Sequence, residues 1–213
     1  MNHFLTRLEG KLLVVLETNP SANLPYHNNE HMKQMWALAR TIWEREEEDV
    51  GLGDSTWNYV VLMFACLFHD WDHSGGHDSD HYNVLRAREF VEELIAKNGY
   101  TLPGRVIKAI DDAIAVTEFP FVIQPKNRLE AVIRDADSLY ATHRRDPTVI
   151  IDGLRQEMEV KFGNAISDQQ MLDGHIDFMA KTTMFTKTAH DIWAANAQPF
   201  VEDLKRYVKE RGN

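Results

Sequence analysis

The sequence predicts an all-α protein, and three observations carry the prediction. Apolar residues recur every three or four positions over most of the 213-residue chain, which is the period of an amphipathic helix. Clusters of proline, glycine, serine and asparagine separate these segments. No stretch of convincing length alternates apolar and polar side chains as a half-buried strand does. Since the chain also lacks internal repeats and low-complexity linkers, we expect residues 1–213 to form a single multi-helix bundle domain.

The first two helices are predicted over residues 2–18 and from near Pro25 to about Glu48. Both segments carry an apolar stripe at helical spacing, and the first can be capped by Asn2. The cluster at residues 19–23 separates them, because asparagine, proline and serine favour turns. The acidic run at 44–49 is expected to be a solvated face.

The third helix is predicted to be the core of the fold. Residues 60–68 are apolar without interruption, and Ser55 can cap the segment after a turn at 51–54. A run of this length and composition, ended by Gly75 and Gly76, is typical of a helix that is buried on all sides.

The remaining helices are predicted from their start and stop signals. Ser79 and Ser167 are suitable N-caps, and Asn98-Gly99 is a suitable C-terminus. Three further helices have a proline at or near their start, where the missing N–H costs nothing. The expected ranges are 79–97, 103–117, about 126–142, 147 to about 161, a helix after 167, and about 188–211.

Composition and charge exclude several classes of protein. The formal charge of −10 argues against a nucleic-acid backbone as the main partner, although it allows a small phosphate substrate bound through cations. No apolar run reaches the roughly 18–20 residues of a membrane span. The N-terminus lacks the features of a signal peptide, and the single Cys66 permits no intramolecular disulfide. We therefore expect a cytoplasmic protein that neither spans a membrane nor binds nucleic acid.

Three parts of the chain carry residues that suit a metal ion. His69 and Asp70 end the core helix, where burying ionisable groups is costly unless they are paired or bound to a metal. His27 and His31 are four residues apart and would share one face of a helix, so that one can bind metal while the other reaches a substrate. Asp137 lies in an apolar helix, with Asp135 roughly 160° away around the axis and hence in a different role. Imidazole and carboxylate suit a first-row divalent cation.

These motifs resemble a known family. The pattern His31 … His69-Asp70 … Asp137 is similar to that of the HD-domain metal-dependent phosphohydrolases. Tyr-His-Asn-Asn-Glu-His at 26–31 and His-Asp-Trp-Asp-His at 69–73 resemble more closely the class I cyclic-nucleotide phosphodiesterases. Val-Thr-Glu at 116–118 and Ala-Asp-Ser at 136–138 also resemble segments of those enzymes. The resemblance covers about residues 24–140, with a faint continuation at 175–178.

The resemblance implies an HD-type helical fold with a metal site between core helices, and a hydrolase mechanism. His31, His69, Asp70 and Asp137 would hold a tight Zn, Fe or Mn ion, and Asp70 would bridge to a second ion, Mg or Mn, bound mostly through water. A hydroxide between the two ions would attack the phosphorus of a small phosphate ester, a nucleotide in this family. His27 would be the general acid that protonates the leaving group.

Further roles follow from the same resemblance. Asp72 and His73 would orient the metal ligands, while Thr117 and Glu118 would hydrogen-bond metal-bound water. Tyr26, Phe178, Met179 and Phe185 are candidate walls of the substrate pocket. The C-terminal region is shorter than in the class I enzymes and has no Gln at the position expected for their purine-binding residue, so the resemblance does not transfer base specificity.

The sequence leaves alternative functions open. The four-residue metal set is shared with HD phosphohydrolases that act on nucleoside mono- or triphosphates. His73, His77 and His81 are spaced so that they could ligate a second iron, as in the di-iron HD oxygenases, although Gly75-Gly76 favours exposed loop histidines. His143, His175 and His190 are expected to be structural or surface residues. A non-catalytic sensing module is the remaining alternative, and the complete ligand set argues against it.

Overall fold

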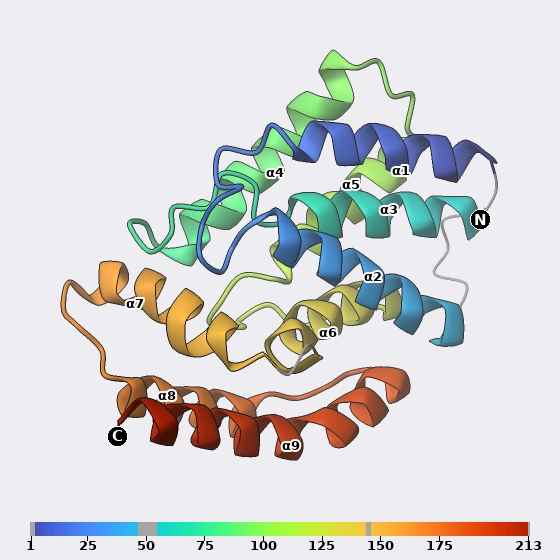
Figure 1. The fold of residues 1–213 in the computed structure, drawn as a ribbon. Helices are drawn as coiled ribbons and strands as arrows, with labels where there is room; N and C mark the ends of the chain where they lie inside the picture. Colours follow the sequence, from blue (N-terminus) through green and yellow to red (C-terminus); the bar gives the residue numbers. More distant parts are fainter. Residues whose placement is uncertain (1–2, 47–54, 144–145, 213) are drawn as a thin grey trace.

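The computed structural model describes residues 3–46, 55–143 and 146–212 (Figure 1). These residues form helices joined by turns and contain no β-strand, which confirms the all-α prediction. None of the described helices has the length and apolar character needed to cross a membrane. The helices are α1 (His3–Leu16), α2 (Asn29–Glu46), α3 (Ser55–Phe68), α4 (Asp80–Lys97), α5 (Gly104–Ala115), α6 (Arg128–His143), the π-helical segment η1 (Val149–Leu154), α7 (Arg155–Phe162), α8 (Asp168–Lys181) and α9 (Lys187–Arg211).

Helix α3 is the centre of the fold, as predicted. Every residue from Val60 to Phe68 is fully buried, because α1, α2, α5 and α6 all pack against this helix. The helix starts at Ser55 itself, while the predicted turn at 51–54 and the acidic residues 47–49 lie outside the described residues. An entirely apolar helix gains most from such a position, since each buried side chain contributes about 1.5–3 kcal/mol.

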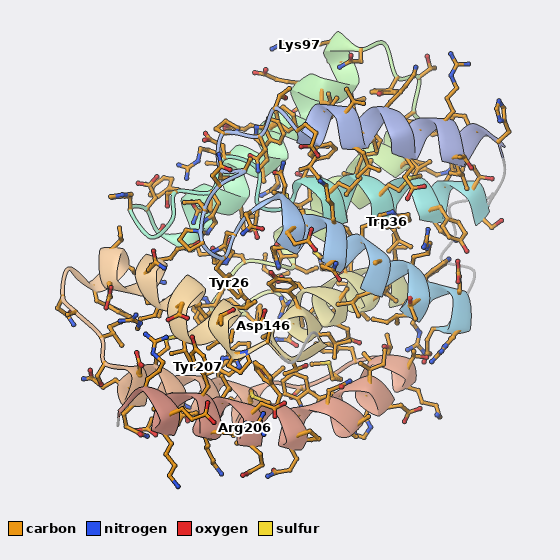
Figure 2. All side chains as sticks on the ribbon, viewed as in Figure 1. Tyr26, Trp36, Lys97, Asp146, Arg206 and Tyr207 are labelled. Carbon is orange, nitrogen blue, oxygen red and sulfur yellow. The ribbon has the colours of Figure 1, made fainter. Side chains whose placement is uncertain are left out.

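The helices form two packed groups with the candidate site between them. In Figure 1, α8 and α9 run side by side at the bottom, α1 and α3 to α5 lie at the top, and α6 and α7 lie between. Two apolar clusters correspond to this division, one built around α3 and one around η1, α8 and α9. Figure 2 shows exposed Lys97 and Arg206 at the periphery, while the buried Tyr26 lies near the middle of the molecule.

The second helix starts later than predicted, and this changes the place of His27. Helix α2 begins at Asn29, because the Asn28 side chain accepts hydrogen bonds from the backbone N–H groups of Glu30 and His31 and so caps the helix. His27 therefore precedes the helix rather than sharing a helical face with His31. The two rings are nevertheless close, with centroids 5.9 Å apart.

The helix predicted for residues 147–161 is interrupted by a π-helical segment. Residues 149–154 are π-helical, and the regular α7 follows to Phe162. Gly153 lies in this segment, where a Cβ atom would come within 2.7 Å of the Pro25 carbonyl oxygen. The missing side chain lets η1 pack directly on the segment that carries His27, and π-helical turns are frequent next to functional sites.

Candidate metal centre and substrate pocket

Four donor atoms from three parts of the chain converge on one point. His31 lies in the first turn of α2, His69 and Asp70 directly follow α3, and Asp137 lies in α6. His31 Nε2 is 3.0 Å from His69 Nε2, 3.1 Å from Asp70 Oδ2 and 3.3 Å from Asp137 Oδ1. His69 Nε2 is 2.9 Å from the Asp70 oxygen and 3.6 Å from the Asp137 oxygen. We refer to these four residues as the four-donor centre.

The spacing of these donors fits a metal ion. Donors placed about 2.0–2.2 Å from one ion lie about 2.8–3.6 Å apart, depending on whether the angles are octahedral or tetrahedral. The measured separations of 2.9 to 3.6 Å agree with that range. Both imidazoles are 1% exposed, and a cation shared by the two ring nitrogens and the two carboxylates would offset the cost of placing them away from bulk water.

The histidines are oriented by groups outside the four-donor centre. His69 Nδ1 lies 3.2 Å from the carbonyl oxygen of Cys66, which fixes the proton on Nδ1 and leaves the Nε2 lone pair for a metal. Tyr26 stacks on His31 with centroids 5.6 Å apart, and Tyr140 contacts the same ring edge-on at 4.4 Å. Among the described residues, His31 Nδ1 has no hydrogen-bond partner. The rings are therefore held with Nε2 toward the carboxylates.

The electrostatics of the four-donor centre favour positive charge. Burial by itself would lower the pKa of His69, but the Asp70 and Asp137 carboxylates outweigh it and raise that pKa well above its usual range. Burial likewise opposes ionisation of Asp70 and Asp137, and the neighbouring imidazoles still hold both carboxyl pKa values well below normal. A place that stabilises a proton so strongly also stabilises a divalent cation.

Beside the four-donor centre, His27 forms a close pair with Glu157. His27 Nδ1 is 2.5 Å from Glu157 Oε2, and the other carboxylate oxygen accepts the backbone N–H groups of Tyr26 and His27. Burial lowers the pKa of His27, but the charges of Asp70 and Glu157 raise it to about 9. The imidazole is thus held as an imidazolium at neutral pH, which is the state a general acid requires.

Glu157 is the functional residue that sequence reasoning missed. It lies among charged residues of α7 in a pattern typical of a solvated helix face, yet its side chain is only 4% exposed. Gly76 makes this possible: its φ is +97°, and a Cβ atom there would collide with the Glu157 backbone oxygen and lie 3.0 Å from Lys161 N. No signal in the sequence links this glycine to a helix 80 positions later.

His73, which was predicted to orient the metal ligands, lies next to this pair. Its ring stacks on His27 with centroids 3.9 Å apart and an interplanar angle of 27°. Its Nδ1 accepts the Gly75 N–H, while its Nε2 is 3.9 Å from Asp80 Oδ1. Asp80 also accepts the Phe119 N–H, and sequence reasoning overlooked it because it reads as an ordinary first-turn acid of α4.

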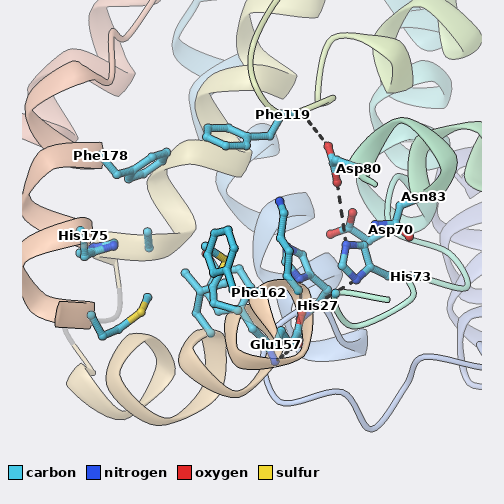
Figure 3. Close-up of a pocket in the computed structure, with 18 of the residues that line it drawn as sticks. His27, Asp70, His73, Asp80, Asn83, Phe119, Glu157, Phe162, His175 and Phe178 are labelled. Carbon is cyan, nitrogen blue, oxygen red and sulfur yellow. Dashed lines mark hydrogen bonds and ion pairs between the residues drawn. The ribbon is translucent and has the colours of Figure 1, made fainter. Parts of the chain in front are cut away.

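The four-donor centre and the His27–Glu157 pair open into one cavity of about 460 Å³. Figure 3 shows Asp70, His27 and His73 on one side of this pocket and Phe178 and His175 on the other. The second side is mostly apolar and aromatic. Its further lining residues include Phe119, Phe121, Leu154, Met158, Phe162, Ile166 and Met171. A cavity of this size and composition suits a small molecule with one anionic and one planar or apolar part.

The predicted pocket walls are partly right. Tyr26 and Phe178 line the cavity, as does the buried Thr117, whose hydroxyl donates to the carbonyl of Ile114. Met179 and Phe185 do not line it, although both were predicted to. Met179 points into the apolar cluster around Phe200, because it lies one position around α8 from Phe178.

Asp72 and Glu118 were predicted to support the metal site, but their side chains do not point toward the four-donor centre. The Asp72 side chain is 49% exposed and lies 3.8 Å from Arg86, and its backbone has a positive φ of 56°. Glu118 is directed at His81, 3.2 Å away, rather than into the four-donor centre. His77 and His81 are both exposed, as predicted, but His81 lies in the first turn of α4 and only His77 lies in the loop before it.

Asp135, which points away from Asp137 around α6, holds backbone groups of a neighbouring segment. It is fully buried and accepts the backbone N–H groups of Phe185 at 2.9 Å and Thr186 at 2.8 Å. These bonds fix the start of α9 against α6. Asp135 and Asp137 therefore face different surroundings, since Asp135 accepts backbone N–H groups at the start of α9 and Asp137 lies beside His31.

His175 lies at the far end of the pocket in an apolar environment. The residue is 3% exposed, and its Nε2 has no hydrogen-bond partner among the described residues. It stacks on Phe178 with centroids 5.8 Å apart and contacts Phe200 edge-on. Burial lowers the pKa of His175 to about 4, so the ring is neutral at physiological pH. The sequence-based expectation of a structural or surface residue omitted its place in the pocket wall.

This burial predicts a specific loss of stability in mild acid. The unfolded chain protonates His175 with a pKa of about 6.5 and the folded chain at about 4, so unfolding takes up a proton between these values. As pH falls from about 7 to 5, wild type should lose about 2 kcal/mol relative to His175→Phe. Urea unfolding of both proteins at the two pH values measures this difference. Parallel pH dependence of the two proteins would show that His175 is protonated in the fold.

Comparisons with known proteins agree on the fold and give no function. No protein-family model matches the chain, and neither does any curated protein. Among solved structures, a protein from Lactobacillus plantarum determined in a structural genomics programme has a similar fold, with a TM-score of 0.59. The match covers 100% of this chain and 98% of that chain at 18% sequence identity. At this identity the similarity concerns the fold alone.

Proposed function

We propose that the chain is a metal-dependent phosphohydrolase of the HD-domain type, acting as a phosphodiesterase on a cyclic nucleotide or related nucleotide ester. One observation carries the proposal: four metal-type donors 2.9 to 3.6 Å apart share a pocket with a histidine whose pKa is raised to about 9. Phosphoester hydrolysis needs both elements, a cation for the phosphate charge and an acid for the leaving oxygen.

The four-donor centre would hold a Zn, Fe or Mn ion, and Asp70 would share a further Mg or Mn ion with it. When bound, such ions polarise a phosphate and lower the pKa of a water molecule to near neutrality. The two imidazoles favour a transition metal in the tight site, because Mg²⁺ prefers oxygen ligands.

In the proposed reaction, His27, Glu157 and the aromatic side of the pocket have separate roles. His27 holds its Nδ1 proton against Glu157, so its Nε2 is the atom available to protonate a leaving oxygen. Glu157 also accepts two backbone N–H groups, which fix the orientation of that imidazole. The aromatic side of the pocket, with Phe178 and Phe119, would bind the planar part of the substrate by stacking and by excluding water.

The proposal is tested by following the phosphorus directly. Metal-loaded protein is incubated with cyclic and linear nucleotides and monitored by ³¹P NMR, with Asp70→Ala as the inactive control. Conversion of a cyclic phosphate to a 5′-monophosphate, absent in Asp70→Ala, supports the phosphodiesterase. Release of inorganic phosphate or triphosphate would instead assign the chain to nucleoside mono- or triphosphate hydrolysis. If the metal-loaded protein hydrolyses none of these nucleotides, the proposed function is wrong.

The His27–Glu157 pair also makes a pH prediction. A general acid works below its pKa, so the rate falls as pH rises through the pKa of His27. The charges of Asp70 and Glu157 both hold this pKa high; Glu157→Gln removes the second of them, and the basic limb of the kcat profile should move to lower pH by about 1–2 units. Glu159→Gln, on the same helix but paired with Arg155, is the matched control and should keep the wild-type limb. If the basic limb of the kcat profile of Glu157→Gln lies at the same pH as in wild type, His27 is not the general acid.

A further inference from the structure

A second group of metal-type donors lies beside the four-donor centre and shares no residue with it. His27, His73 and Glu157 each offer one ligand atom, and these atoms all lie within 4.8 Å of one another. Both imidazoles turn the same nitrogen toward one carboxylate oxygen: His27 Nδ1 is 2.5 Å and His73 Nδ1 is 3.9 Å from Glu157 Oε2. We refer to these three residues as the His27 cluster.

We propose that the His27 cluster is a separate binding site for a transition-metal dication such as Zn²⁺, and that its occupation inhibits the enzyme. Two imidazoles and one carboxylate with an open fourth position are a donor set that Zn²⁺ takes in proteins. Mg²⁺ is a poor match, because only one of the three donors is an oxygen. The site therefore distinguishes zinc-like ions from the magnesium expected to work in catalysis.

The surroundings of the His27 cluster suit an ion that enters from the pocket. The His73 and Glu157 side chains are 5% and 4% exposed, while His27 is 23% exposed and borders the cavity, which leaves a coordination position for water. His73 Nδ1 accepts the Gly75 N–H and is therefore unprotonated, and an ion bound to this lone pair would replace that hydrogen bond. Asp80, 3.9 Å from His73 Nε2, is placed to orient the ring from outside.

Binding requires a small change in the rings and the release of one proton. The two imidazoles are stacked at 27°, so both Nδ1 atoms reach one ion only if the rings turn about χ2, a torsion with a broad energy profile. The ion takes the place of the proton between His27 and Glu157, and that proton leaves to solvent. His27 then has no proton on Nδ1 and is fixed to the ion, so it cannot act as the acid. The inhibition rests on the proposed function, whereas the binding site does not.

The experiment counts Zn²⁺ ions on the full chain by isothermal titration calorimetry, without substrate. Wild type should bind one Zn²⁺ more than Glu157→Gln and His73→Asn do, or bind it at least about 10-fold more tightly. His73→Asn retains an acceptor for the Gly75 N–H, which protects the fold. Both variants should keep the ion of the four-donor centre, and Glu159→Gln should bind as wild type does. His31→Asn/Asp137→Asn, which disrupts that centre, should retain the extra ion.

Two results would overturn the site: unchanged Zn²⁺ binding in both Glu157→Gln and His73→Asn, or loss of the extra ion in His31→Asn/Asp137→Asn with a folded circular dichroism spectrum. An extra ion bound by a protein that hydrolyses nothing would contradict the proposed function and leave the site standing. An active enzyme whose rate is insensitive to Zn²⁺ at concentrations that fill the extra site would contradict the inhibition.

Discussion

His31→Ala should lose its tight metal ion and its activity together, whereas His27→Ala should keep the ion and lose rate by about 10²–10⁴-fold. The difference follows from geometry. His31 Nε2 lies within 3.3 Å of three other donors, so its removal leaves the ion with an incomplete shell. His27 instead points at Glu157 and contributes no atom to the four-donor centre. Its loss removes an acid and leaves the ligands in place.

The measurement is metal content per chain after dialysis against metal-free buffer, together with kcat on the substrate found by ³¹P NMR. Dialysis removes weakly held ions, so that only the tight site is counted. His77→Ala is the matched control, because His77 is exposed in the loop that follows the metal ligands and should change neither quantity. Equal metal loss in His31→Ala and His27→Ala would show that the roles of the two histidines are wrongly assigned.

Gly76→Ala should destabilise the protein by about 3 kcal/mol or more and reduce activity sharply. Two costs combine at this position. The φ of +97° is strained for any residue with a Cβ, and the added atom would collide with the Glu157 backbone oxygen. Relief of the collision requires α7 to move away from the loop, and this movement separates Glu157 from His27.

Gly163→Ala is the control that separates the cost of the positive φ from the cost of the collision. Gly163 ends α7 with a φ of +68°, but nothing lies within 4 Å of the position that its Cβ would take. Its replacement should therefore cost only about 1 kcal/mol, the backbone part. Urea unfolding measures both variants, and kcat at pH 7 measures the effect on the acid. If Gly76→Ala is no worse than Gly163→Ala, the close packing of α7 on the glycine loop does not contribute to stability.

The sequence predicted the helices well because their signals are local. The continuous apolar run at 60–68 specifies a buried helix wherever it lies, and Ser167 forms the predicted N-cap of α8 with Gln170 completing a capping box. The sequence misplaced the start of one helix and missed an irregular segment in another. Asn28 caps α2 and so moved its start beyond His27, and the π-helical turns of η1 replaced a predicted regular helix.

The sequence by itself pointed to the donors His31, His69, Asp70 and Asp137, through their residue types and through the family that their motifs resemble, and the structure brings these four side chains together. Only the tertiary structure decided which other residues share the pocket. Glu157 looks like a surface acid in its own helix, and it is buried because Gly76 and Gly153, both lacking a side chain, let η1 and α7 pack closely on segments more than 75 positions away. Such an approach depends on shape rather than on local pattern. For the same reason the sequence predicted only Tyr26 and Phe178 among the pocket walls, and it did not predict those formed by the loop at Phe119 and by α7.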